Sequence, residues 1–155
     1  MAARDGALAI YHFGQALHAI ASSLKDCPTL RTYTNHGKLR LARKQFEAHF
    51  PSVTSIRHVI GHIADFAATI GDKEKHSIRG PYKETFGRVG IQVHDTAKIT
   101  FSDNLYDHTY AVTYDGAVHT CEISSKTLRT LVAVRETTYS GFDAALAQQT
   151  GQRNR

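Results

Sequence analysis

Residues 50–70 read FPSVTSIRHVIGHIADFAATI, and apolar side chains recur along this stretch at steps of three and four. That period places one face of an α-helix against a core, so the stretch predicts an amphipathic helix. Its apolar members are Val53, Ile56, Ile60, Ile63, Ala67 and Ile70. Pro51 suits the first turn, where the missing N–H of proline costs no helical hydrogen bond. We therefore predict a helix from Pro51 to about Ile70 that stops at Gly71-Asp72.

The opposite face of this predicted helix carries an unusual set of residues: Arg57, His58, Gly61, His62 and Asp65. An ordinary solvated face carries mostly Lys and Glu, whereas this one combines a guanidinium, two imidazoles and a carboxylate around a glycine. Glycine in a helix interior costs roughly 1 kcal/mol relative to alanine. Gly61 therefore indicates the close approach of another backbone or of a ligand.

The composition is that of a globular chain, with 155 residues, 41% of them hydrophobic, and three prolines. This length is sufficient to bury a core in one domain, so we predict a single domain over residues 1–148 and a polar tail over residues 149–155. The formal charge of +5 and the pI near 9.3 permit a polyanionic partner without requiring one.

The cysteines and the apolar runs indicate the compartment. Cys27 and Cys121 lie far apart and form no CxxC pair, and isolated thiols are typical of a reducing environment. The N-terminal residues lack the pattern of a secretory signal peptide. No apolar run approaches the roughly 20 residues that span a bilayer. We therefore expect a soluble, cytoplasmic protein that makes no membrane contact.

Helical spacing of apolar residues also occurs on both sides of the opening stretch. On this basis we predict helices over residues 4–25 and 38–50, a last helix that begins at Ser124 or Ser125 as N-cap, and a further helical segment over residues 142–146. The segments 29–37 and 71–87 are expected to be loops, the second of them long and basic.

Short runs of β-branched and aromatic residues predict strands over residues 88–94, 97–102, 108–114 and 117–123. Tyr110, Val112 and Tyr114 alternate along the third run, which gives it one apolar face. Asp115-Gly116 predicts a two-residue hairpin turn between the last two strands. The predicted fold class is therefore α+β: mainly a helical bundle, with a small antiparallel β-meander in the C-terminal half that needs a helix over one face.

Three interpretations of the face formed by Arg57, His58 and His62 remain open. In the first, these are simply polar residues on an exposed helix surface. In the second, His58 and His62 are two metal ligands four residues apart on one helix. Val59, however, stands where metalloproteases carry a glutamate. A third ligand would have to come from Asp65, His76 or His94.

The third interpretation is phosphodiester cleavage without a metal. An imidazole can accept or deliver a proton near neutral pH, and a guanidinium can bind phosphate oxygens with two parallel hydrogen bonds. RNA supplies its own nucleophile, the 2′-OH, so these groups are sufficient for internal transesterification. The products would be a 2′,3′-cyclic phosphate and a 5′-hydroxyl. Two copies of the helix across a two-fold axis would double the available groups, and Gly61 would allow the partner helix to come close.

The hexapeptide Arg57-His58-Val59-Ile60-Gly61-His62 resembles the R-polar-x3-H motif of the HEPN superfamily of helical RNases and RNA-binding domains. The surrounding FEAHFPSVTSIRHVIGHIADF also resembles the paired helices around that motif, and the resemblance covers about residues 39–72. It implies a helical bundle that dimerises to build a composite cleft, with Arg57 and His62 as the catalytic pair and His58 as the supporting polar residue.

Further expectations follow from this resemblance. The chain would be a metal-independent endoribonuclease or an RNA-binding protein derived from one, with RNA as its partner and no cofactor. The alternative is a non-catalytic dimerisation or partner-binding scaffold of the same fold. The superfamily is common in toxin–antitoxin, anti-phage and CRISPR-linked systems, which adds a neutralising partner protein to the expected partners.

Several other residues are candidates for contact with RNA. Arg40, Arg43 and Lys44 form a cationic patch on the preceding helix, which is either a solvated surface or a rim that attracts phosphate. We place them with Asp65 in the substrate-binding set. The rings of Tyr106, Tyr110 and Tyr114 are a further candidate, as a platform on which bases stack.

Overall fold

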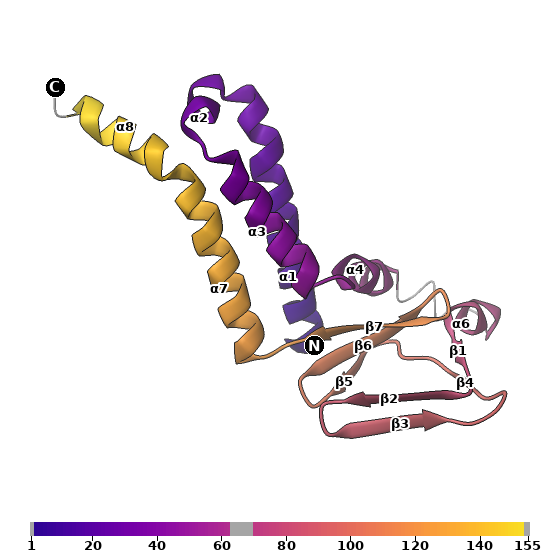
Figure 1. The fold of residues 1–155 in the computed structure, drawn as a ribbon. Helices are drawn as coiled ribbons and strands as arrows, with labels where there is room; N and C mark the ends of the chain where they lie inside the picture. Colours follow the sequence, from indigo (N-terminus) through magenta and orange to yellow (C-terminus); the bar gives the residue numbers. More distant parts are fainter. Residues whose placement is uncertain (1, 63–69, 154–155) are drawn as a thin grey trace. The chain divides into compact units, whose positions relative to one another are not determined.

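The chain forms two compact units, each built from two separate segments of sequence. The computed structural model describes residues 2–62 and 70–153 (Figure 1). The sheet unit comprises Met1–Tyr11 and Pro51–Ser124, and the helical unit comprises His12–Phe50 and Ser125–Arg155. The single domain expected over residues 1–148 stays a prediction, because two compact units are compatible with one domain or with two.

The helical unit contains only helices in its described residues. They are α1 (Ala2–Ser23) from His12 onward, η1 (Leu24–Asp26), α2 (Pro28–Tyr33), α3 (His36–His49), α7 (Ser125–Tyr139), η2 (Ser140–Phe142) and α8 (Asp143–Arg153). The helices α3 and α7 lie side by side. The side chain of Asn35 caps α3 by accepting a hydrogen bond of 3.1 Å from the backbone N–H of Lys38.

Phe46 is the centre of the helical core between α1 and α3. Its ring is 4% exposed and lies 5.9 Å from the ring of Phe13 and 5.1 Å from that of Phe50, measured between centroids. Gly14 on α1 faces the same ring. A Cβ added at Gly14 would overlap Cε1 of Phe46 and lie 2.7 Å from its Cζ. A glycine is therefore required here by close packing.

Gly14→Ala is expected to lower the free energy of unfolding by about 1–3 kcal/mol, because the added methyl group would displace a buried ring. Gly61→Ala is the matched control, since the nearest atom of the described residues to a Cβ there is Nη1 of Arg57, at the ordinary contact distance of 3.8 Å. That variant is expected to be neutral or slightly more stable, by up to about 1 kcal/mol. Urea denaturation followed by circular dichroism measures both, and equal losses would contradict the packing assigned to Gly14.

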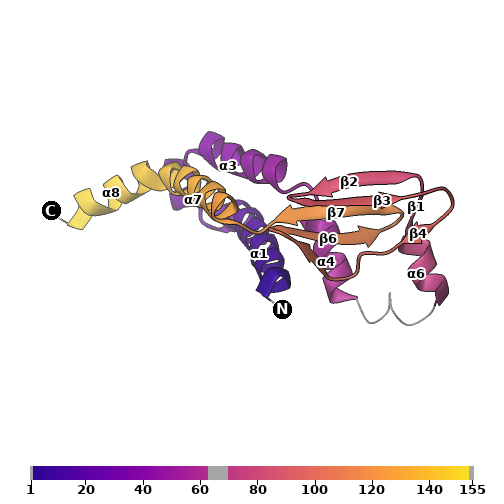
Figure 2. The ribbon, with the colours of Figure 1, turned by 90° about the horizontal axis from the view of Figure 1, so that it is seen from below.

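The sheet unit combines short helices with small antiparallel sheets. Its elements are the start of α1, α4 (Val53–Gly61), α6 (Ile70–His76), β1 (Ile78–Arg79), β2 (Tyr82–Phe86), β3 (Val89–Val93), β4 (Lys98–Ile99), β5 (Asn104–Tyr106), β6 (Thr109–Tyr114) and β7 (Ala117–Glu122). The strands pair as a β5-β6-β7 sheet, a β2-β3 hairpin and a β1-β4 ladder. Figures 1 and 2 show α4 on one face of the three-stranded sheet and the hairpin on the other.

The central strand β6 is buried on both faces. Tyr110, Ala111, Val112 and Thr113 are each 2% exposed or less, although successive side chains of a strand point to opposite faces. The face with Tyr110, Val112 and Tyr114 lies against α4, whose Val53, Ile56 and Val59 are buried. The other face packs on the β2–β3 side, where Phe86 and Phe101 form the centre of a second core. The predicted apolar face of β6 and its helical cover are therefore confirmed.

The hairpin turn predicted at Asp115-Gly116 is confirmed. Asp115 has φ of 52° and Gly116 has φ of 73°, the pair of positive values that a type I′ turn requires. The two residues join β6 to β7, which are antiparallel from the pair Tyr114–Ala117 to the pair Thr109–Glu122. This register fixes which side chains of the hairpin share a face.

Several predicted elements are confirmed with small changes at their ends. The helices predicted over residues 4–25, 38–50 and from Ser124 or Ser125 correspond to α1, α3 and α7, and the predicted strands correspond to β3, β4, β6 and β7. The α+β class is confirmed at the level of a mixed helical and sheet fold, whereas a HEPN-like bundle stays a prediction. None of the described helices combines the length and the apolar character needed to cross a lipid bilayer.

Other predictions were wrong. Residues 28–33 form α2, because Pro28 at the first helical position begins a short helix where a loop was expected. Residues 71–87 contain most of α6, then β1 and β2, instead of one long connection. The strands β2 and β5 were missed, since Lys, Glu and Asn disfavour strands on average and only pairing with neighbours overrides this. The polar tail over residues 149–155 stays a prediction, and α8 extends into it as far as Arg153.

The helix predicted from Pro51 to about Ile70 is present, but its predicted C-terminal boundary was wrong. The helix α4 ends at Gly61, and His62 leaves helical geometry with φ of −123° and ψ of 20°. Gly61 is thus the last residue of a helix and not an interior one, so its helix cost is smaller than the sequence suggested. Residues 63–69, which include Ile63, Asp65 and Ala67 of the predicted helix, lie outside the described residues.

Cys27 is exposed and Cys121 is buried, and both are free thiols. Burial, with a smaller contribution from the charge of Glu122, raises the pKa of Cys121 to about 11. At pH 8 its thiolate fraction is then on the order of 10⁻³. We expect a thiol reagent to modify Cys27 quickly and Cys121 at least about 100-fold more slowly. Cys27→Ser should remove the fast phase, and a fast phase that persists would contradict the burial of Cys121.

Candidate functional site

The side chains of the predicted site come from the last two turns of α4. Arg57 and His62 are exposed and His58 is partly buried, while Ile56 and Val59 on the opposite side are buried against the sheet. The apolar stripe thus fixes the rotation of the helix, because it can be satisfied only when Ile56 and Val59 point inward. The polar residues are held at the edge of the sheet unit as a consequence.

The imidazoles of His58 and His62 are in contact, and the ring of Tyr114 from the sheet contacts that of His58. The imidazole centroids of His58 and His62 are 4.8 Å apart, and that of His58 is 5.0 Å from the ring centroid of Tyr114. Tyr114 is the last residue of β6, on the face that α4 covers. The i, i+4 spacing on α4 explains the contact between the two imidazoles.

Two further histidines approach the same tyrosine. The ring of His76, the last residue of α6, stacks on that of Tyr114 at 5.1 Å with an angle of 12°. The ring of His119 on β7 lies 6.2 Å from Tyr114. We call His58, His62, His76, His119 and Tyr114 the histidine cluster. It gathers four imidazoles from three elements of the sheet unit, α4, α6 and β7, around the phenol ring of β6.

A hydrogen bond fixes the tautomer of one cluster member. The backbone N–H of Asp115 donates to Nδ1 of His76 at 3.1 Å. Because Nδ1 accepts this bond, the proton of the neutral ring lies on Nε2. The donor belongs to the type I′ turn, so the hairpin geometry that Asp115-Gly116 dictates also orients the imidazole.

The helix α6 is tied to the neighbouring strand β4 near His76. Nζ of Lys98 lies 2.8 Å from Oε2 of Glu74, and this hydrogen-bonded cation lowers the pKa of the Glu74 carboxyl. Oγ of Ser77 forms a hydrogen bond of 2.7 Å with Oγ1 of Thr100. These two contacts position the segment that presents His76 to Tyr114.

Arg57 contacts a ring outside the cluster. Its Cζ lies 5.7 Å from the ring centroid of Tyr11 on α1, a cation–π contact. Its Nη1 is also the atom nearest to a Cβ built on Gly61. Within one chain the structure therefore brings His58 and His62 together and turns Arg57 toward Tyr11. The close approach of another backbone or of a ligand at Gly61 stays a prediction.

The predicted substrate-binding residues fall into different parts of the chain. Arg40, Arg43 and Lys44 lie on α3 in the helical unit, where Arg40 and Arg43 line a hollow of about 360 Å³ with His36. Nε of Arg43 lies 3.9 Å from Oε1 of Glu47. Their role as a phosphate-binding rim stays a prediction. Asp65, the remaining member of that set, lies outside the described residues.

The tyrosines predicted as a stacking platform do not share one face. Tyr110 is 1% exposed, its hydroxyl donates to Oδ1 of Asp103 at 2.8 Å, and it lies in the core. Tyr106 pairs with Thr109, which places it on the opposite face of the sheet, where it stacks on Phe86 at 5.5 Å. Only Tyr114 remains near the candidate site. The three-ring platform was therefore wrong.

A metal centre finds no support in the described part of the chain, where no three His, Cys, Asp or Glu residues come together in a way that could hold an ion. His58 and His62 approach each other as rings, and Asp65, one of the possible third ligands, lies outside the described residues. What the cluster offers chemically is two imidazoles in contact and two more beside Tyr114, a set suited to proton transfer.

Sequence reasoning missed His119, and it named His76 only as a possible metal ligand and Tyr114 only as a stacking ring. No motif links them, since they lie on different elements, and only the pairing of β6 with β7 and the placement of α6 bring them to α4. Their one common property in the sequence is the high number of histidines, ten in 155 residues. No protein-family model matches the chain, and comparisons with curated proteins and with solved structures likewise find no match.

Proposed function

We propose that this chain is a HEPN-like, metal-independent endoribonuclease that cleaves RNA by attack of the 2′-OH on the adjacent phosphorus. The observation that carries the proposal is the histidine cluster, in which His58 and His62 are 4.8 Å apart and two more imidazoles lie around Tyr114. RNA supplies the nucleophile, so a protein has to supply a base, an acid and a cation.

In this mechanism one imidazole of the pair His58 and His62 removes the proton of the 2′-OH. A protonated imidazole delivers a proton to the 5′-oxygen as it leaves. The bond between the 2′-oxygen and phosphorus forms while the bond from phosphorus to the 5′-oxygen breaks. The products are a 2′,3′-cyclic phosphate and a 5′-hydroxyl, and no redox partner or metal enters the balance.

The guanidinium of Arg57 stabilises the charge on the phosphoryl oxygens in the transition state. Within one chain Arg57 contacts Tyr11 and His62 contacts His58. For that reason we retain the homodimer as part of the proposal, with Arg57 of the partner subunit completing the site. We also propose a neutralising partner protein and a role in anti-phage or toxin–antitoxin systems. Both rest on the HEPN resemblance alone.

The proposal is tested by incubating single-stranded RNA with excess EDTA and either the wild type, Arg57→Ala or His62→Ala. Cleavage that survives chelation in the wild type and is lost in both variants is the expected result. Cleavage that appears only after a divalent metal is restored would identify a metal-dependent nuclease instead. Intact RNA under both conditions would overturn the proposal.

Exposed apolar residues on α7 favour a second candidate, the non-catalytic dimerisation or partner-binding scaffold. Leu128, Val132 and Tyr139 are 62%, 39% and 60% exposed. Steps of four and seven place them along one side of the helix, and contiguous exposed apolar surface is typical of interaction sites. Light scattering on the same preparation separates the two candidates: a dimer that leaves RNA intact with and without metal is a scaffold.

A further inference from the structure

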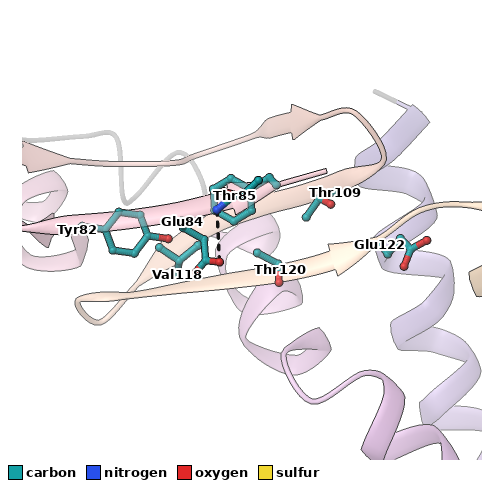
Figure 3. A pocket seen from close by; sticks show the side chains of 8 residues that line it. Tyr82, Glu84, Thr85, Thr109, Val118, Thr120 and Glu122 are labelled. Atoms are coloured by element: carbon teal, nitrogen blue, oxygen red, sulfur yellow. Dashed lines mark hydrogen bonds between the residues drawn. The ribbon is translucent and has the colours of Figure 1, made fainter. Parts of the chain in front are cut away.

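A pocket of about 350 Å³ lies between β2 and the strands β6 and β7, on the sheet face opposite to α4 (Figure 3). Its volume is within the range of small-molecule sites. The register places Val118, Thr120 and Glu122 of β7 on this face, while His119 and Tyr114 lie on the other. The pocket is therefore separate from the histidine cluster, and a ligand in it would not compete for the same groups.

The residues that line the pocket carry negative charge and no positive charge. Glu84 and Glu122 contribute carboxylates, and no Lys, Arg or His is among the lining residues. The chain as a whole has a formal charge of +5, so an acidic pocket contrasts with the rest of it. Oε1 of Glu84 accepts a hydrogen bond of 3.4 Å from the backbone N–H of Thr85. No ion pair with Glu84 occurs among the residues that the structure describes.

The hydroxyl of Tyr82 is a second polar group at the pocket. Its oxygen is buried and forms no hydrogen bond within the described part of the chain. Buried polar atoms are nearly always hydrogen-bonded, so an exception calls for an explanation such as a missing ligand. Burial, followed by the charge of Glu84, raises the pKa of Tyr82. The hydroxyl and the carboxylate therefore act on the same part of the pocket, as Figure 3 shows.

The remaining lining residues define the shape of a matching ligand. Phe86 is 4% exposed and Val118 packs against the same core, so one wall is apolar. Thr109 and Thr120 add hydroxyl groups that can accept a hydrogen bond. An apolar wall beside carboxylate and hydroxyl acceptors suits a molecule with methylene groups and a charged N–H donor.

We propose that this pocket binds a small organic ammonium compound. Its ammonium group donates hydrogen bonds to the carboxylate of Glu84 and to Oη of Tyr82, and its methylene groups lie against Phe86 and Val118. Glu122 at the other end of the lining attracts a second ammonium group, which favours a short diamine. A metal ion fits less well, because metal-binding groups of three or more residues are absent from the described part of the chain.

The test is a titration of the ¹⁵N-labelled full-length chain with 1,4-diaminobutane, followed by NMR. We expect saturable shifts at the amides of β2 and β7, and Glu84→Gln should weaken binding about tenfold or more, because the hydrogen bonds to a charged acceptor are lost. Glu136→Gln is the matched control. Its carboxylate lies on α7 and is bound by Arg135 at 2.6 Å, so its removal should leave the affinity unchanged.

Butan-1-ol and potassium chloride at equal concentration provide the ligand controls. Equal shifts with the neutral alcohol or with the salt would overturn the proposal, as would the absence of saturation or an unchanged affinity in Glu84→Gln. Tyr82→Phe separates an effect on diamine affinity from an effect on the stability of the fold. It should weaken diamine binding several-fold while Tm stays the same or rises, because the variant removes a buried hydroxyl to which no described residue hydrogen-bonds. A lower Tm with unchanged affinity would contradict the role given to Tyr82.

Discussion

His62→Ala is expected to lower the rate of RNA cleavage by about 10²–10⁴-fold, the range that a positioned general acid or base contributes. His62 is exposed at the end of α4 and its ring contacts His58. Its removal therefore leaves the buried stripe of α4 unchanged, and the free energy of unfolding should stay within about 0.5 kcal/mol of the wild type. Cleavage of a fluorescent RNA at fixed pH and in EDTA measures the rate.

His94→Ala is the matched control for this variant. His94 is an exposed histidine of the same unit that follows β3 and is not a member of the histidine cluster. Its replacement should leave the cleavage rate unchanged. A rate that falls equally in His94→Ala and His62→Ala would show a general effect of histidine loss. A rate that falls in neither would remove His62 from the mechanism.

Phe101→Ala is expected to lower the free energy of unfolding by about 3–5 kcal/mol, the loss typical of a buried phenylalanine. Phe101 is 2% exposed and its ring meets that of Phe86 at 5.9 Å and that of Tyr106 at 5.8 Å, both nearly perpendicular. Interiors are close-packed, so the neighbouring rings can fill the vacated space only in part and a cavity remains. Urea denaturation followed by circular dichroism reports the change.

Leu105→Ala is the control for Phe101→Ala. Leu105 is an apolar residue of β5, but it is 52% exposed. Its effect should stay within about 0.5 kcal/mol. Equal losses of unfolding free energy in the two variants would contradict the burial of Phe101 against Phe86 and Tyr106. A loss confined to Phe101→Ala also supports the wall of the pocket, since Phe86 belongs to the same cluster.

Local periodicity was sufficient to predict the helices whose apolar residues are evenly spaced. Val53 and Ile56 of the predicted stripe are buried, although its next member, Ile60, is only half-buried and Val59 beside it is buried instead. Asp115-Gly116 carried the backbone preference of its own turn. In these places the residues that determine the structure are neighbours in sequence. Propensity and pattern then agree with the tertiary environment.

The predictions failed where the local structure depends on contacts with segments that are distant in sequence. Nothing in the stripe from Val53 onward marks the end of α4 at Gly61, because the apolar spacing continues through Ile63. Tyr82, Glu84 and Phe86 alternate as in a strand, but Lys83 and Glu84 have low strand propensity and only pairing with β3 settles the matter. The pocket could not be predicted for the same reason.

The candidate site was predictable in part. The contact of His58 with His62 follows from helical spacing alone, and that pair was named from the sequence. The turn of Arg57 toward Tyr11 was not, since Tyr11 comes from α1. Likewise His76 and His119 reach Tyr114 only through the packing of α6 and the register of the β6–β7 hairpin.

The most direct measurement of the proposed chemistry uses a DNA oligonucleotide that contains one ribonucleotide, incubated with the purified protein in EDTA. We predict a single cut on the 3′ side of that ribonucleotide, with a 2′,3′-cyclic phosphate on one product and a 5′-hydroxyl on the other, and no cut in the all-DNA strand. A cut in both strands, or a 5′-phosphate on the product, would contradict attack by the 2′-OH and with it the assignment of acid–base chemistry to His58 and His62.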